Sequence, residues 1–152
     1  SWSQHAQRYA AIEPVRGREY WEADQKQGEI SKRITMRHAY GVTPNMRVLV
    51  PRAYTVLASS VATTGATTIA VTTAADFPAS GDYMVLVDSE LMEVTAGHNT
   101  TGWTVSRAKG GTAAATHATA ADVQEMVAHN IIAAIDVDDR RRELEIMATE
   151  NP

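Results

Sequence analysis

The feature that most constrains this chain is a change of composition near residue 56 that reverses near residue 128. Residues 1–55 carry nine Lys/Arg and five Asp/Glu, a net charge of +4, whereas residues 56–127 carry two and seven, a net charge of -5. Residues 128–152 carry three and six, a net charge of -3, so the three segments sum to the total of -4. The middle segment also holds 15 Ala and 13 Thr.

The two outer segments resemble each other more than either resembles the middle. Five stretches in them have strand patterns: residues 6–12, 30–38, 46–50, 130–135 and 142–147. Pro51 is expected to end the third of these, and the last two are expected to form a hairpin around an acidic turn. Residues 17–27 are expected to form one short helix or ordered loop. A single core is predicted to bury Ile34, Met36, Val48, Ile132, Leu144 and Ile146.

The middle segment also has short strand patterns separated by turn residues. These lie at residues 68–72, 83–87, 91–95 and 103–105, and residues 88–90 are expected to join the second and third as a hairpin. Insertions into loops are tolerated because closure entropy grows slowly with loop length. We therefore predict an all-β chain: a small β-barrel of about five strands, residues 1–55 plus 128–152, interrupted by an inserted β module, residues 56–127.

The sequence offers no pattern for catalysis, a cofactor or a metal. There is no Cys, so thiolate metal sites and Cys nucleophiles are excluded. None of the five His forms an H-x-x-x-H pair, and we expect no Asp or Glu to cluster with them. The acidic stretch at residues 136–139 is interpreted as a hairpin turn, since Arg141 stands where a calcium loop needs Gly. We predict that the chain is not an enzyme and uses no cofactor.

Charge and hydropathy also limit the partners. No apolar run reaches the roughly 18 residues that a membrane helix needs, so no membrane partner is expected. The N-terminus lacks the basic-then-apolar pattern of a signal peptide, and its first residue is Ser, which indicates a removed initiator or a missing leading segment. The net charge of -4 argues against general nucleic-acid binding.

Two groups of side chains have more than one interpretation. The run Arg140, Arg141 and Arg142 is either solvated, paired with an acidic face of a neighbouring subunit, or in contact with DNA. Tyr20 and Trp21, flanked by charges, are either core residues or interface anchors.

The outer segments resemble the head–tail joining family of tailed bacteriophages, also called head-closure or stopper connectors. The resemblance lies in the order and spacing of several short motifs. These are Trp2 with Ala10-Ala11-Ile12-Glu13-Pro14, then Gly17-Arg18-Glu19-Tyr20, Ile34-Thr35-Met36-Arg37, Val42-Thr43-Pro44-Asn45-Met46-Arg47-Val48, and residues 135–146 with Ile135-Asp136-Val137-Asp138 and Leu144-Glu145-Ile146. They cover residues 2–54 and 129–150, and the order holds only when the middle is excised.

The middle resembles a small β module that recurs in phage structural proteins. Its motifs here are Phe77-Pro78-Ala79-Ser80-Gly81, the hairpin Val87-Asp88-Ser89-Glu90-Leu91-Met92-Glu93-Val94, and residues 111–118, which begin Gly111-Thr112 and end His117-Ala118. The module has an Arg-Gly turn where this chain has Arg107-Ala108.

The first resemblance implies a structural protein of the virion neck, assembled in the host cytoplasm. It implies a homo-oligomeric ring of six copies that seals the portal channel after DNA packaging and offers a docking surface to the tail. The adaptor or portal ring would lie on one side, the tail terminator or tail tube protein on the other, and packaged double-stranded DNA is a further candidate partner. The alternatives are a tail terminator or adaptor and, from another class, a carbohydrate- or host-surface-binding module.

The segment from Gly17 to Gly28 is the candidate for the element that blocks the channel. Its two end glycines permit the backbone angles that a moving loop needs. Around a ring, aromatic and charged side chains of this segment would meet their copies: Arg18, Glu19, Tyr20, Trp21, Glu22 and Asp24. The rival interpretation is a fixed clamp that faces the adaptor ring.

Overall fold

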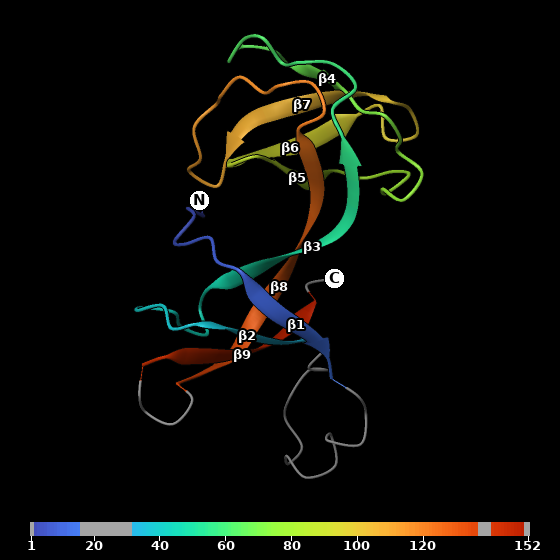
Figure 1. The fold of residues 1–152 in the computed structure, drawn as a ribbon. Helices are drawn as coiled ribbons and strands as arrows, with labels where there is room; N and C mark the ends of the chain where they lie inside the picture. Colours follow the sequence, from blue (N-terminus) through green and yellow to red (C-terminus); the bar gives the residue numbers. More distant parts are fainter. Residues whose placement is uncertain (1, 16–31, 137–140, 151–152) are drawn as a thin grey trace. The chain divides into compact units, whose positions relative to one another are not determined.

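The computed structural model describes residues 2–15, 32–136 and 141–150, and these form an all-β fold (Figure 1). No helix occurs among these residues, and so none that could cross a membrane. The chain divides into two compact units: unit 1 comprises Ser1–His5 and Val50–Val127, and unit 2 comprises Ala6–Leu49 and Ala128–Pro152. The all-β fold class predicted from the sequence is confirmed.

Unit 2 is built from antiparallel strands that alternate between buried and exposed positions. They are β1 (Ala10–Pro14), β2 (Lys32–Arg37), β9 (Glu143–Glu150), the second part of β8 (Asp122–Asp136) and the start of β3 (Arg47–Val56). The order is β1-β2-β9-β8, and β3 pairs with β8. Ile34 of β2 lies opposite Ile146 of β9, and both are buried with Leu144 and Ile131. This aliphatic face is the core of the unit.

The expected barrel is not closed in the part of the chain that the structure describes. β1 pairs with β2 and with no further strand, and every residue of β1 is exposed. An antiparallel sheet can keep one face in water, so closure is not required for stability. Unit 2 therefore contains strands in the regions expected of the barrel, but they form an open antiparallel sheet.

Two further expectations about these strands are wrong. β3 continues through Pro51 to Val56. Within the described residues β8 is its one strand partner, so its other edge needs no N–H donor at Pro51. Ile131 is buried in place of Ile132, because a bulge between Ile131 and Ala133 changes which side chain faces the core. Met36 and Val48 are half-buried.

Unit 1 holds the remaining strands and the larger core. β5 (Tyr83–Val87) lies between the first part of β8 and β6 (Glu90–Ala96), and the order continues through β7 (Gly102–Lys109) to β4 (Thr68–Ala70). An isolated bridge joins Leu57, after β3, to Val71, after β4, so backbone pairing links the two ends of this strand order. Gln4 donates its N–H to the carbonyl oxygen of Gly110 at 2.6 Å, which holds the N-terminal residues on this unit.

The core of unit 1 is mainly aliphatic and contains three aromatic rings. Trp103 is fully buried and its ring centroid lies 5.0 Å from that of Phe77 and 5.9 Å from that of Tyr83. Fully buried Val85, Val87, Val94 and other aliphatic side chains surround this cluster. Burial, together with the smaller effect of the nearby Glu125 carboxylate, raises the pKa of Tyr83 to about 12.

Candidate functional site

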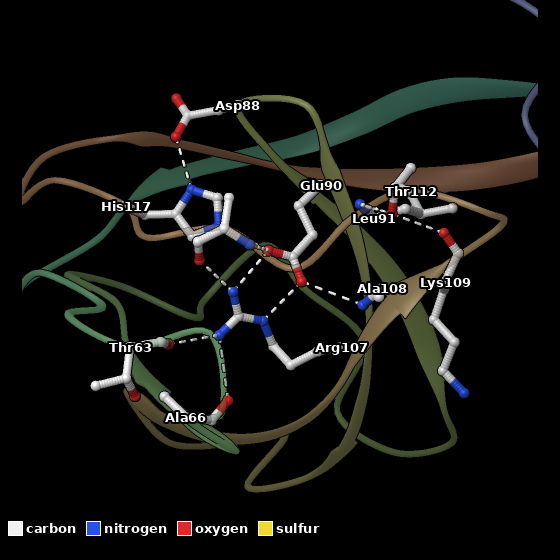
Figure 2. Close-up of polar contacts among 11 residues, drawn as sticks. Thr63, Ala66, Asp88, Glu90, Leu91, Arg107, Ala108, Lys109, Thr112 and His117 are labelled. Carbon is white, nitrogen blue, oxygen red and sulfur yellow. Dashed lines mark hydrogen bonds and ion pairs between the residues drawn. The ribbon is translucent and has the colours of Figure 1, made fainter.

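The most organised polar feature is a buried network in unit 1 around Glu90, shown in Figure 2. Glu90 is the first residue of β6 and pairs with Val87 across a two-residue turn. The hairpin was expected to turn over residues 88–90, but Asp88 takes a φ of 53° and reverses the chain one residue earlier. That geometry directs the Glu90 side chain inward, where it is 0% exposed.

Arg107 on β7 neutralises this carboxylate. Its Nε donates to Glu90 Oε1 at 2.7 Å and its Nη2 donates to Glu90 Oε2 at 2.6 Å, a bidentate ion pair. The remaining donors bind backbone carbonyl oxygens: Nη1 contacts Thr63 at 3.4 Å and Ala66 at 3.2 Å, and Nη2 contacts Ala115 at 2.5 Å. One guanidinium therefore connects two strands with two loops.

The backbone next to Arg107 also depends on Glu90. Ala108 stands where the resembled module has Gly, and its φ of 56° lies in the region that favours glycine. Its N–H donates to Glu90 Oε1 at 3.1 Å, and the N–H of Ala115 donates to Oε2 at 2.9 Å. These contacts hold the turn in its left-handed conformation although an alanine occupies it.

His117 joins the network from the opposite loop. Its Nε2 lies 3.0 Å from Glu90 Oε2 and its Nδ1 lies 2.7 Å from Asp88 Oδ2. A neutral imidazole donates from one ring nitrogen, so the tautomer decides which of the two carboxylates receives its proton. The expectation that no acidic residue clusters with a histidine is wrong at His117.

Charge in this network is balanced by hydrogen bonds. Burial by itself favours the neutral acid and raises the pKa of Glu90, but the hydrogen bonds from Arg107, Ala115, His117 and Ala108 outweigh it. The net result lowers the pKa of Glu90 from 4.5 to about 2. Glu90 is therefore ionised at neutral pH, and the network is a fixed ion cluster.

The arrangement connects structural elements of unit 1. The two carboxylates lie on opposite nitrogens of the His117 ring, so they do not converge on one point where an ion could sit. No group of three possible metal ligands occurs among the described residues. The network acts as a clamp that fixes the loops at residues 63–66 and 115–117 to β6 and β7.

A second ion pair in the same unit joins a buried glutamate to an exposed arginine. Glu125 of β8 is 2% exposed and receives both Nε, at 3.0 Å, and Nη2 of Arg52 on β3. The two residues are 73 positions apart in sequence, so no local pattern links them. The signal available in the sequence was a glutamate at an inward position of a strand, between Val123 and Val127.

The sequence-predicted site residues lie partly outside the described residues. The candidate channel segment, Gly17 to Gly28, is outside them, and so is Arg140. Arg141 and Arg142 are described, both are exposed, and both line a groove of unit 2 with Arg37. The guanidinium carbon of Arg141 lies 5.7 Å from the ring centroid of Tyr40, a cation–π contact.

Comparisons with known proteins give one match. A family model described as phage head completion protein matches residues 1–76, which is half of the chain and spans β1 to β4. No curated protein matches the chain. No solved structure matches it either.

Proposed function

The chain belongs to the phage head completion protein family, and from this premise we propose that it is the stopper of the neck. Membership gives a structural role in head completion, a location at the head–tail region of the virion, and association with other phage head or tail proteins. The finer proposal is a ring of six copies that seals the portal channel after DNA packaging and docks the tail.

The observation that carries this proposal is the extent of the family match. It starts at residue 1 and includes β1, β2 and β3, and the segment Gly17 to Gly28 lies between β1 and β2. A segment in that place belongs to the matched region rather than to the module that follows. We propose that copies of this segment meet at the axis of the ring and close it, with Tyr20 and Trp21 in contact between copies.

The inserted module has a separate role in this proposal. Its buried Glu90 and Arg107 hold its own loops, and its core cluster contains none of the residues that form the aliphatic face of unit 2. We propose that this module, residues 56–127, faces outward and is dispensable for closing the channel. A host-surface-binding role has less support, because Phe77, Tyr83 and Trp103 are buried and cannot stack on a sugar.

Shortening the segment between Tyr20 and Gln25 tests the proposal. The stopper role predicts complete necks, seen by electron microscopy, on particles that lose packaged DNA during purification. A fixed clamp predicts that the ring fails to join the head, so necks are absent. Fully assembled particles that retain their DNA would contradict both roles. Images that place the protein in the tail instead of the neck would favour the tail-terminator alternative.

A further inference from the structure

Unit 2 carries a groove that is lined by three arginines. The groove has a volume of about 860 Å³ and is lined by Tyr9 with the start of β1, by the end of β2, and by Arg141 to Glu143. Arg37 and Arg142 line it, and within the described residues their side chains form no ion pair. Glu143 is the acidic residue of the lining, so the three arginines exceed it in charge.

Arg141 is held in place at the rim of this groove. Its φ of 53° is an unfavourable backbone conformation for an arginine, and it persists because neighbouring groups fix it. Its N–H donates to Asp136 Oδ1 at 3.1 Å, and its guanidinium lies over Tyr40. His38 supports both, with Nε2 at 3.7 Å from Asp136 Oδ2 and its ring edge against Tyr40 at a centroid distance of 4.9 Å. The guanidinium of Arg141 is therefore held in one position at the rim of the groove by these contacts.

The surface charge of unit 1 has the opposite sign. Each of its basic side chains pairs with a glutamate of the same unit: Arg52 with Glu125, Arg107 with Glu90, and Lys109 with Glu93. The remaining acidic residues of residues 50–127 are all aspartates and all are exposed: Asp76, Asp82, Asp88 and Asp122. Asp76, Asp82 and Asp122 therefore remain as exposed acidic side chains with no Lys or Arg partner among the described residues.

Two of these aspartates lie next to each other. β5 and β8 are antiparallel, and their register ends with Val87 opposite Val123, so Asp88 and Asp122 follow at the same end. Like charges on neighbouring strand positions repel each other. Asp88 contacts His117, but Asp122 has no hydrogen bond or ion pair within the described residues. A cation supplied from outside would relieve this repulsion.

We propose that the groove of unit 2 binds the Asp88–Asp122 end of unit 1 in a second copy of this chain. The groove is lined by residues of unit 2. The two surfaces differ, so the contact is head-to-tail, and repeated contacts of that kind generate a ring when the rotation closes. This inference rests on the proposed function in that it names the surfaces by which the ring subunits meet.

A charge swap between the two surfaces tests the contact. Arg142→Glu places a carboxylate opposite Asp122 in every interface, and Asp122→Arg places a cation opposite Arg142. Each single variant is expected to weaken self-association by about tenfold or more, because like charges meet. The double variant Arg142→Glu/Asp122→Arg restores one opposite pair in every interface and is expected to regain the association of the wild type. Association is measured by analytical ultracentrifugation in low and high salt, with circular dichroism to verify folding.

The control uses an aspartate at the other end of β5. Asp82 is exposed and precedes Tyr83, so Arg142→Glu/Asp82→Arg has the same net charge as the swap without the restored pair. Rescue by this control, or wild-type association of Arg142→Glu alone, would overturn the inference while leaving the ring intact. A wild-type chain that stays monomeric in low salt would overturn the ring as well. Loss of duplex DNA binding by Arg142→Glu without any change in self-association would assign the groove to DNA and overturn the proposal.

Discussion

Replacing Glu90 by Gln would leave the guanidinium of Arg107 in the interior of unit 1 without a counter-charge. The side chain of Arg107 is 8% exposed and that of Glu90 is 0% exposed, so water cannot take over the role of the carboxylate. Removing one partner of a buried ion pair costs about 3–5 kcal/mol. That is a large part of the roughly 5–15 kcal/mol by which a domain is stable. We expect Glu90→Gln to destabilise unit 1 by this amount.

The same carboxylate predicts how unit 1 responds to acid. The pKa of Glu90 is lowered from 4.5 to about 2 in the folded chain, so the unfolded chain binds the proton more tightly. The stabilisation is fully present above pH 4.5 and is lost as the pH falls toward 2. At about 1.4 kcal/mol for each pH unit of the shift, the loss is on the order of 3 kcal/mol. Glu90→Gln should therefore lose less stability than the wild type over this range.

Urea unfolding followed by the fluorescence of Trp103 measures both effects. Trp103 is fully buried in unit 1, and replacing Trp2 and Trp21 by Phe removes the other tryptophans. Glu93→Gln is the matched control, because Glu93 lies on the same strand and pairs with Lys109 through side chains that are 32% and 35% exposed. A half-exposed pair contributes about 0–1 kcal/mol. Equal losses of unfolding free energy for the two variants would refute the role of the Glu90 network in holding the loops of unit 1.

Two further predictions concern unit 2 and the division of the chain. Leu144→Ala should lower the free energy of unfolding in urea by about 2–5 kcal/mol, because Leu144 is 4% exposed. Ile135→Ala is the control and should lower it much less, because Ile135 is 50% exposed. Equal losses would mean that the buried face of β9 is misassigned. The N–H of Leu57 donates to the carbonyl oxygen of Ala121 at 3.0 Å, so a short Gly-containing turn can replace residues 58–120. We expect that deletion to leave a β-rich protein with cooperative unfolding by circular dichroism, and non-cooperative unfolding would count against the interrupted-domain prediction.

The strands that were predicted well are those in which neighbouring residues alternate between apolar, buried side chains and more exposed ones. β5 has the bounds expected for it, since Tyr83, Val85 and Val87 are inward and the turn follows directly. β8 is longer than expected, because it starts at Asp122 and only residues 130–135 were predicted. Its first part was missed because an inward position is taken by Glu125. A charge at that position is acceptable only through Arg52, whose approach depends on the fold.

The segments that form the candidate site were recognised as motifs in the sequence, but the contacts among their charged side chains were not predicted. The hairpin that contains Asp88 and Glu90 and the segment that ends in His117 were both recognised as recurrent. The link between them could not be predicted, because Arg107 lies 17 residues after Glu90 and His117 lies 27 residues after it. Only the pairing of β6 with β7 and the return of the last loop bring these side chains together.

The bonds from Arg107 to the loops end on carbonyl oxygens, and this has a consequence for how the module can evolve. The guanidinium contacts the backbone carbonyl oxygens of Thr63, Ala66 and Ala115, which every amino acid has. These hydrogen bonds therefore do not depend on the side chains at these positions. Apart from Ala66, whose side chain packs against the core, residues 62–66 and 113–116 are therefore expected to tolerate substitution without loss of these contacts. Asp88, Glu90, Arg107 and His117 cannot be exchanged in the same way, because their side chains form the contacts (Figure 2). Relatives of this module should differ most in the loops that it holds most firmly.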